Sequence, residues 1–72
     1  MKLYLLSQDV NNDYDTYDSC VVAAKSAKEA KLMTPGSSSY DWCKPDDVKV
    51  QYIGEAKRGT KKGEIISSFN AG

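Results

Sequence analysis

The densest group of chemically capable side chains lies in residues 9–20, DVNNDYDTYDSC, which contain four aspartates and two asparagines but no basic residue. Their alternating spacing resembles the opening of a calcium loop, where several oxygen ligands lie on a tightly curved backbone. The alternating residues are Asp9, Asn11, Asp13 and Asp15. The pattern then fails, because Tyr14 replaces the turn-forming glycine and Cys20 replaces the closing bidentate glutamate. We therefore expect a solvated loop without a metal site.

Aromatic rings are interleaved with carboxylates in this stretch and again in residues 37–47, SSSYDWCKPDD. The rings are Tyr14, Tyr17, Tyr40 and Trp42. Such rings can stack on a nucleotide base, while carboxylates accept hydrogen bonds from ribose hydroxyls or exocyclic amines. The plainer alternative is that Tyr17 and Trp42 cap a small core.

A basic segment near the end of the sequence, KRGTKKG at residues 57–63, combines four cations with two glycines. The cations are Lys57, Arg58, Lys61 and Lys62. Positive charge and exposed backbone N–H groups are what a phosphate requires. The segment is not a P-loop, because its spacing differs and an expected strand, not a helix, follows it. A solvated basic turn is the alternative.

The sequence lacks the usual catalytic groups. It contains no histidine, the commonest general base and imidazole metal ligand. Its two cysteines, Cys20 and Cys43, have no C-x-x-C spacing and no base to activate them, so we expect free thiols. Cys20 is expected to pack as a small apolar residue and Cys43 to be the more exposed. No enzymatic activity and no cofactor are expected.

The composition predicts one small domain spanning residues 1–72. Hydrophobic residues make up 40% of the 72 positions and charged residues 28%, a globular balance. A chain this short has a thin core and often gains stability by self-association, so we expect a homo-oligomer. The formal net charge is +0, which argues against general nucleic-acid binding. No apolar run has the length of a membrane span or signal-peptide core, so a cytosolic location is expected.

The first part of the sequence predicts two strands, which would position the groups described above. Residues 2–8, KLYLLSQ, and residues 19–25, SCVVAAK, are apolar runs of strand length. They predict an antiparallel hairpin whose long connection is residues 9–18. Ser26 followed by Glu29 is a capping box and predicts the start of a helix of two to three turns. Ala27, Ala30 and Met33 would form its buried face.

Pro35 and Gly36 are expected to end that helix, and residues 37–47 to form a loop. Residues 48–56, VKVQYIGEA, alternate in polarity and predict a half-buried strand. Residues 64–70 predict a last strand, joined to it in a second hairpin with Gly59 and Gly63 at positive φ. The expected fold is α+β: a ββαββ domain whose antiparallel sheet carries one short helix on one face.

Nearly the whole chain resembles a group of very short, mostly uncharacterised bacteriophage accessory proteins. The resemblance rests on DYDTYDSCVVAAKSAKEAK, then DWCKPDDVKVQYIGEA, then a GxxxG-type turn and SSFNAG. It implies a counter-defence role in the host cytoplasm, either by gripping a host defence enzyme or by sequestering a nucleotide messenger, as sponges of CBASS and Thoeris signalling do.

The sequence therefore suggests a non-enzymatic protein that sequesters a phosphate-bearing nucleotide signal, such as a cyclic dinucleotide or an ADP-ribose derivative. The four rings would hold the base and the four cations the phosphates, at sites between subunits because a monomer this small hardly encloses a dinucleotide. The main alternative is a protein-binding inhibitor that uses its acidic loop as a mimic or adds a partner strand to its sheet edge. A virion accessory protein is the third possibility.

Overall fold

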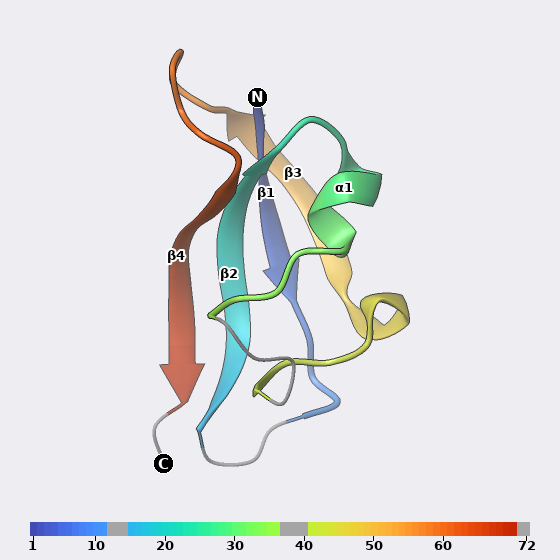
Figure 1. Ribbon diagram of the computed structural model, residues 1–72. Helices are drawn as coiled ribbons and strands as arrows, with labels where there is room; N and C mark the ends of the chain where they lie inside the picture. Colours follow the sequence, from blue (N-terminus) through green and yellow to red (C-terminus); the bar gives the residue numbers. More distant parts are fainter. Residues whose placement is uncertain (12–14, 37–40, 71–72) are drawn as a thin grey trace.

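The computed structural model describes residues 1–11, 15–36 and 41–70 and consists of one four-stranded antiparallel sheet with one short helix on one face (Figure 1). The strands are β1 (Lys2–Ser7), β2 (Thr16–Ala24), β3 (Lys49–Glu55) and β4 (Gly63–Asn70). Along the chain, the helix α1 (Ala27–Lys31) and a 3-10 turn, η2 (Pro45–Asp47), lie between β2 and β3. The expected α+β class, an antiparallel sheet with a short helix, is confirmed.

The expected hairpin of β1 and β2 forms the centre of the sheet. Leu5 pairs with Val21 in this hairpin, and strand alternation turns Tyr4 and Leu6 toward the helix. β2 begins at Thr16, three residues earlier than predicted. The reason is tertiary, because Thr16 and Tyr17 pair with the end of β4, which extends β2 into the predicted loop.

The sheet order is β3-β1-β2-β4, so β3 and β4 lie at opposite edges (Figure 1). The predicted second hairpin is therefore wrong, and residues 56–62 cross the end of the sheet instead. The two most apolar runs of the sequence occupy the centre, where both strand edges are paired, whereas the more polar β3 and β4 flank them. Gly59 and Gly63 do have positive φ, 92° and 136°, as the turn requires.

The helix starts where the sequence predicts. The Ser26 hydroxyl oxygen accepts a hydrogen bond from the Glu29 backbone N–H at 3.2 Å, and the Glu29 carboxylate accepts from the backbone N–H of Lys25. The predicted length is wrong, because α1 ends at Lys31 after little more than one turn. Ala30 is buried but Ala27 is exposed. A helix with so narrow a buried face gains too little from packing to continue toward Pro35.

The core lies between the sheet and the layer formed by α1 and the segment that follows it. α1 packs against β1, β2 and β3. The core residues are Tyr4, Leu6, Cys20, Val22, Ala24, Ala30, Trp42 and Val48. None of the helices in the described ranges has both the length and the apolar composition that crossing a membrane requires. On the opposite face of the sheet, no helix or strand of the described residues forms a second layer, although Ala23, which pairs with Leu3 on that face, is fully buried.

Candidate functional site

The acidic stretch is organised from within by Gln8, whose side chain is buried with the residue only 5% exposed. Its Oε1 accepts hydrogen bonds from the backbone N–H groups of Val10 and Asn11 at 2.9 and 2.8 Å. Its Nε2 donates to the carbonyl oxygens of Asn11 and Tyr17 at 2.8 and 2.7 Å. One amide thus holds both ends of the β1–β2 connection together, a role that the sequence pattern does not reveal.

The described residues of the calcium-like pattern, Asp9, Asn11 and Asp15, do not direct their side chains to a common site. Asn11 donates from Nδ2 to the carbonyl oxygen of Trp42 at 2.8 Å, so its side chain links two loops. Asp9 forms an exposed ion pair with Lys49 at 3.6 Å, and exposed Asp15 sits in a turn with φ 61°. Across the described residues, no three Asp, Glu, Cys or His side chains are placed to share a metal ion. Asp13 lies outside the described residues.

The two described rings of the suggested stacking platform belong to the core. Trp42 is 2% exposed, so it offers no ring face to a base. Tyr17 is half-buried and packs edge-on against Phe69, with ring centroids 4.8 Å apart. A Cβ at Gly36 would lie 3.0 Å from the Tyr17 hydroxyl oxygen, so the chain passes directly over this ring. The interpretation of Tyr17 and Trp42 as core caps is confirmed, while Tyr14 and Tyr40 lie outside the described residues.

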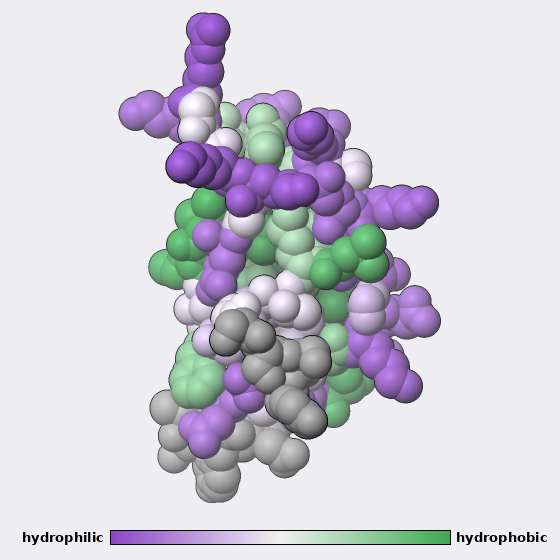
Figure 2. All heavy atoms as spheres, in the orientation of Figure 1, coloured by the Kyte–Doolittle hydropathy of each residue, from purple (hydrophilic) through white to green (hydrophobic). Residues whose placement is uncertain are grey.

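The basic turn lies at the opposite end of the sheet from these rings. Strand register places Glu55 and Gly63, which bound the turn, beside Lys2 and Ala23, whereas Tyr17 pairs near the other end. The length of β1 separates the two ends by about 20 Å at about 3.3 Å per residue. Figure 2 shows hydrophilic side chains gathered at the end that carries the turn. One subunit therefore does not bring the predicted cations and the described rings together.

The turn itself is held by Thr60, whose backbone N–H and hydroxyl both donate to the carbonyl oxygen of Lys57, at 3.0 and 2.6 Å. Lys57, Arg58 and Lys61 are exposed, and Lys62 lies 3.9 Å from the Glu29 carboxylate. The arrangement presents positive charge to solvent.

The cysteines are free thiols, as predicted, and neither is activated. Cys20 is buried in the core, and burial together with the charge of Glu64 raises its pKa to about 11. Cys43 is half-buried and so the more exposed, and burial and the charge of Asp47 raise the pKa of its thiol. Both thiols are therefore protonated at neutral pH, which is unfavourable for nucleophilic chemistry.

A contact that sequence reasoning missed ties β4 to the segment after α1. The Glu64 carboxylate accepts a hydrogen bond from the Gly36 backbone N–H at 3.0 Å, across 28 positions of sequence. A hydrogen bond from Ser67 and this backbone bond together lower the pKa of Glu64. No local pattern signals such a contact, because it depends on how the chain crosses the sheet.

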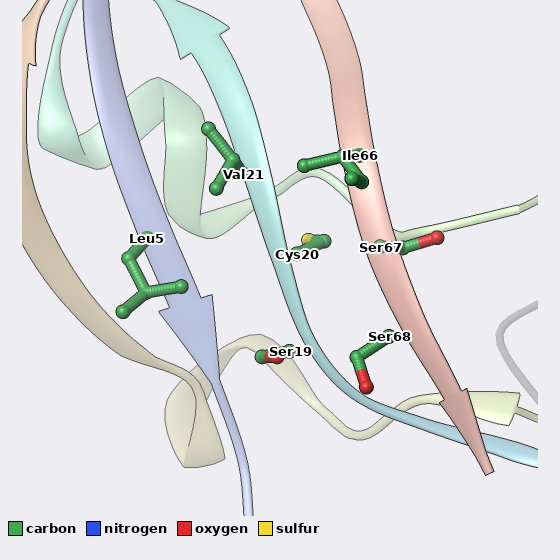
Figure 3. Close-up of a pocket in the computed structure, with 7 residues that line it drawn as sticks. All are labelled: Leu5, Ser19, Cys20, Val21, Ile66, Ser67 and Ser68. Atoms are coloured by element: carbon green, nitrogen blue, oxygen red, sulfur yellow. The ribbon is translucent and has the colours of Figure 1, made fainter.

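The uncovered face of the sheet carries a shallow hollow of about 190 Å³ between β1, β2 and β4 (Figure 3). Leu5, Val21 and Ile66 form its apolar wall, and Ser19 and Ser68 lie at one end (Figure 3). The hollow is smaller than the roughly 300 Å³ at which small-molecule sites begin, so it fits one side chain better than a nucleotide. The unbroken apolar run of β1, apolar on both faces, is the sequence signal for this surface.

The chain was compared with protein-family models, curated proteins and solved structures, and none of them matched. The relation to phage accessory proteins accordingly stays a prediction from the residues.

Proposed function

We propose that this chain is a non-catalytic binding protein that recognises an extended segment of a partner protein by adding it as a strand to the outer edge of β4. The observation that supports this proposal is that the outer edge of β4 is uncharged over most of its length and has exposed apolar side chains. β4 pairs only with β2 among the described residues, and its residues 65–70, IISSFN, contain no charge. Ile65, Ile66 and Phe69 are about half exposed or more, and Figure 2 shows apolar surface along the β4 margin.

The contrast with the other edge supports the choice of β4. Natural edge strands are guarded against strand addition by charges, bulges and shortness. β3 carries Lys49 and Glu55 at its two ends and has a bulge at Ile53 beside Gly54. β4 has the charged Glu64 and a bulge at Ile65, both near its beginning, and its residues 66–70 have neither a charge nor a bulge. Main-chain hydrogen bonds to this edge would supply affinity, and the exposed side chains would supply specificity.

The raised pKa values of both thiols and the lack of histidine in the sequence favour a binding role over a catalytic one. The resemblance to phage accessory proteins supplies the partner that we propose, a host defence enzyme met in the host cytoplasm.

A selection from a display library of short random peptides tests the edge directly. We expect enriched peptides with alternating apolar and polar residues, and we expect them to protect the β4 amides from hydrogen exchange. Ile65→Lys should weaken their binding at least about tenfold, because an outward charge opposes strand addition.

Ile53→Lys is the matched control, since Ile53 is the bulge residue of the other edge and is 45% exposed against 51% for Ile65. It should leave binding unchanged. The proposal fails if no peptide is enriched, or if both lysine variants weaken binding equally.

Sequestration of a nucleotide signal is the second candidate, favoured by the four cations of the basic turn. In this version Lys57, Arg58, Lys61 and Lys62 hold the phosphates, and Tyr17 and Trp42 remain core residues. Native mass spectrometry with a panel of cyclic dinucleotides and ADP-ribose derivatives tests it. Replacing Arg58 and Lys61 together with alanine should weaken binding about a hundredfold, because charge-assisted hydrogen bonds are lost. A complex that retains its affinity in the double variant would contradict this candidate.

A further inference from the structure

We infer that the uncovered face of the sheet is the interface of a homodimer, in which two copies stack face to face as a sandwich. Strand alternation places Leu3, Leu5, Val21 and Ile66 on this face; we call them the open-face strip. An antiparallel sheet that faces water usually carries polar side chains there. Here the first three are half-buried apolar residues, and Ile66 projects with 65% of its surface exposed.

The charge of the face favours a second copy as its occupant. Among the residues that strand pairing assigns to this face, Lys49 is the only charged one, and it lies on the outer strand β3 beside Ser7. The exposed Asp18 carboxylate also lies at the margin of the face, where it accepts a hydrogen bond from the Ser19 hydroxyl at 3.3 Å. The whole chain has a formal net charge of +0. Two identical copies can therefore approach with little repulsion between like charges, a condition that promotes self-association.

The shape of the face is self-complementary. Ile66 is exposed and stands directly at the rim of the hollow that it shares with Leu5 and Val21 (Figure 3). A two-fold axis beside Ile66 lets the isoleucine of each copy enter the hollow of the other, as an isologous interface requires. Ser19 and Ser68 then lie at the polar margin of the contact.

The area of the face determines the affinity that we expect for the dimer. Four strands about 4.8 Å apart and about 20 Å long give a projected face of roughly 400 Å² per copy. Both copies together bury roughly 800 Å², which is below the roughly 1,200 to 2,000 Å² of stable interfaces, so we expect a weak dimer with a dissociation constant well above micromolar. The second layer also helps a domain this small, whose core lies on only one side of its sheet. The outer edge of β4 stays accessible in this dimer, so the inference does not depend on the proposed function.

Sedimentation velocity and native mass spectrometry over a wide range of protein concentration test the inference. We expect the parent chain to reach the mass of a dimer and Ile66→Lys to weaken dimerisation about a hundredfold or more, because the charge enters a two-fold interface twice. Ser68→Lys, which adds a charge at the rim without removing an apolar group, should also weaken it. Circular dichroism checks that each variant is folded.

Ile65→Lys is the matched control, since Ile65 is the neighbouring exposed isoleucine of the same strand but does not line the hollow. It should dimerise like the parent while losing edge binding, so the dimer and the proposed function fail separately. Adding NaCl should change the dissociation constant less than about threefold, because the strip is uncharged. A parent chain that stays monomeric, a dimer that Ile66→Lys leaves intact, or equal loss in both isoleucine variants overturns the inference.

Discussion

At the residue scale, Gln8 stabilises the β1–β2 connection, because its one buried side-chain amide makes four hydrogen bonds to the backbone there. Gln8→Ala leaves the groups that it satisfies without partners, and we expect a loss of about 2 to 4 kcal/mol of unfolding free energy. This should lower the thermal midpoint by about 10 °C or more. Unfolding can be followed by the fluorescence of buried Trp42. Gln51→Ala, an exposed glutamine on β3, is the control, and an equal shift in both variants would contradict this role.

The thiols give a second expectation at this scale. Alkylation near neutral pH should modify Cys43 first, since Cys20 is buried in the core and its pKa is raised to about 11. Cys20 should react only as fast as the protein opens, and denaturant should make the two rates similar. Mass spectrometry of the labelled peptides measures both rates. Equal labelling of the two cysteines in the native protein would show that the β2 core is open.

At the scale of elements, α1 depends on its first turn more than a longer helix would. It has five residues and buries Ala30 alone, so the hydrogen bond from the Glu29 N–H to the Ser26 hydroxyl is a large share of its stabilisation. Ser26→Ala should reduce the unfolding free energy by about 1 kcal/mol, and chemical denaturation measures this loss. Ser26→Asp keeps an acceptor at the cap and should stay near the parent value. If both variants unfold alike, the cap contributes nothing measurable.

At the scale of the whole molecule, the Glu64 carboxylate connects β4 with the segment that covers the core. Its pKa is lowered below the ordinary value of 4.5 by the hydrogen bonds from Ser67 and Gly36. The ionised form therefore stabilises the fold fully above that ordinary value, and the contribution is lost as pH falls through the lowered pKa. Glu64→Gln should reduce stability near neutral pH, with the difference from the parent shrinking in acid.

Denaturant midpoints measured between about pH 7 and pH 3 test this linkage, with the sign given by the lowered pKa. Glu55→Gln, an exposed carboxylate at the end of β3, is the control and should follow the parent at each pH. A difference for Glu64→Gln that stays constant down to acid pH would mean that its ionised state makes no special contribution.

The sequence by itself determined the elements whose signals are local. The apolar runs of β1 and β2 and the alternation of β3 predict strands because side chains alternate across a pleated sheet. Ser26 and Glu29 mark the start of α1 because the capping contact spans three residues. Gly59 and Gly63 mark a turn because positive φ strains other residues. The burial of Cys20 follows from its place in an apolar run.

The tertiary structure alone decided how these elements meet. The order β3-β1-β2-β4 separates the strands that the sequence suggested as a hairpin, and it places the basic turn and Trp42 at opposite ends of the sheet. Pairing between distant strands also lengthens β2, forms the hollow beside Ile66 and brings Glu64 to Gly36. A local pattern indicates which face of a strand is apolar, but it does not indicate which neighbouring strand or helix covers that face. The choice of neighbour depends on the total free energy of all the contacts in the sheet.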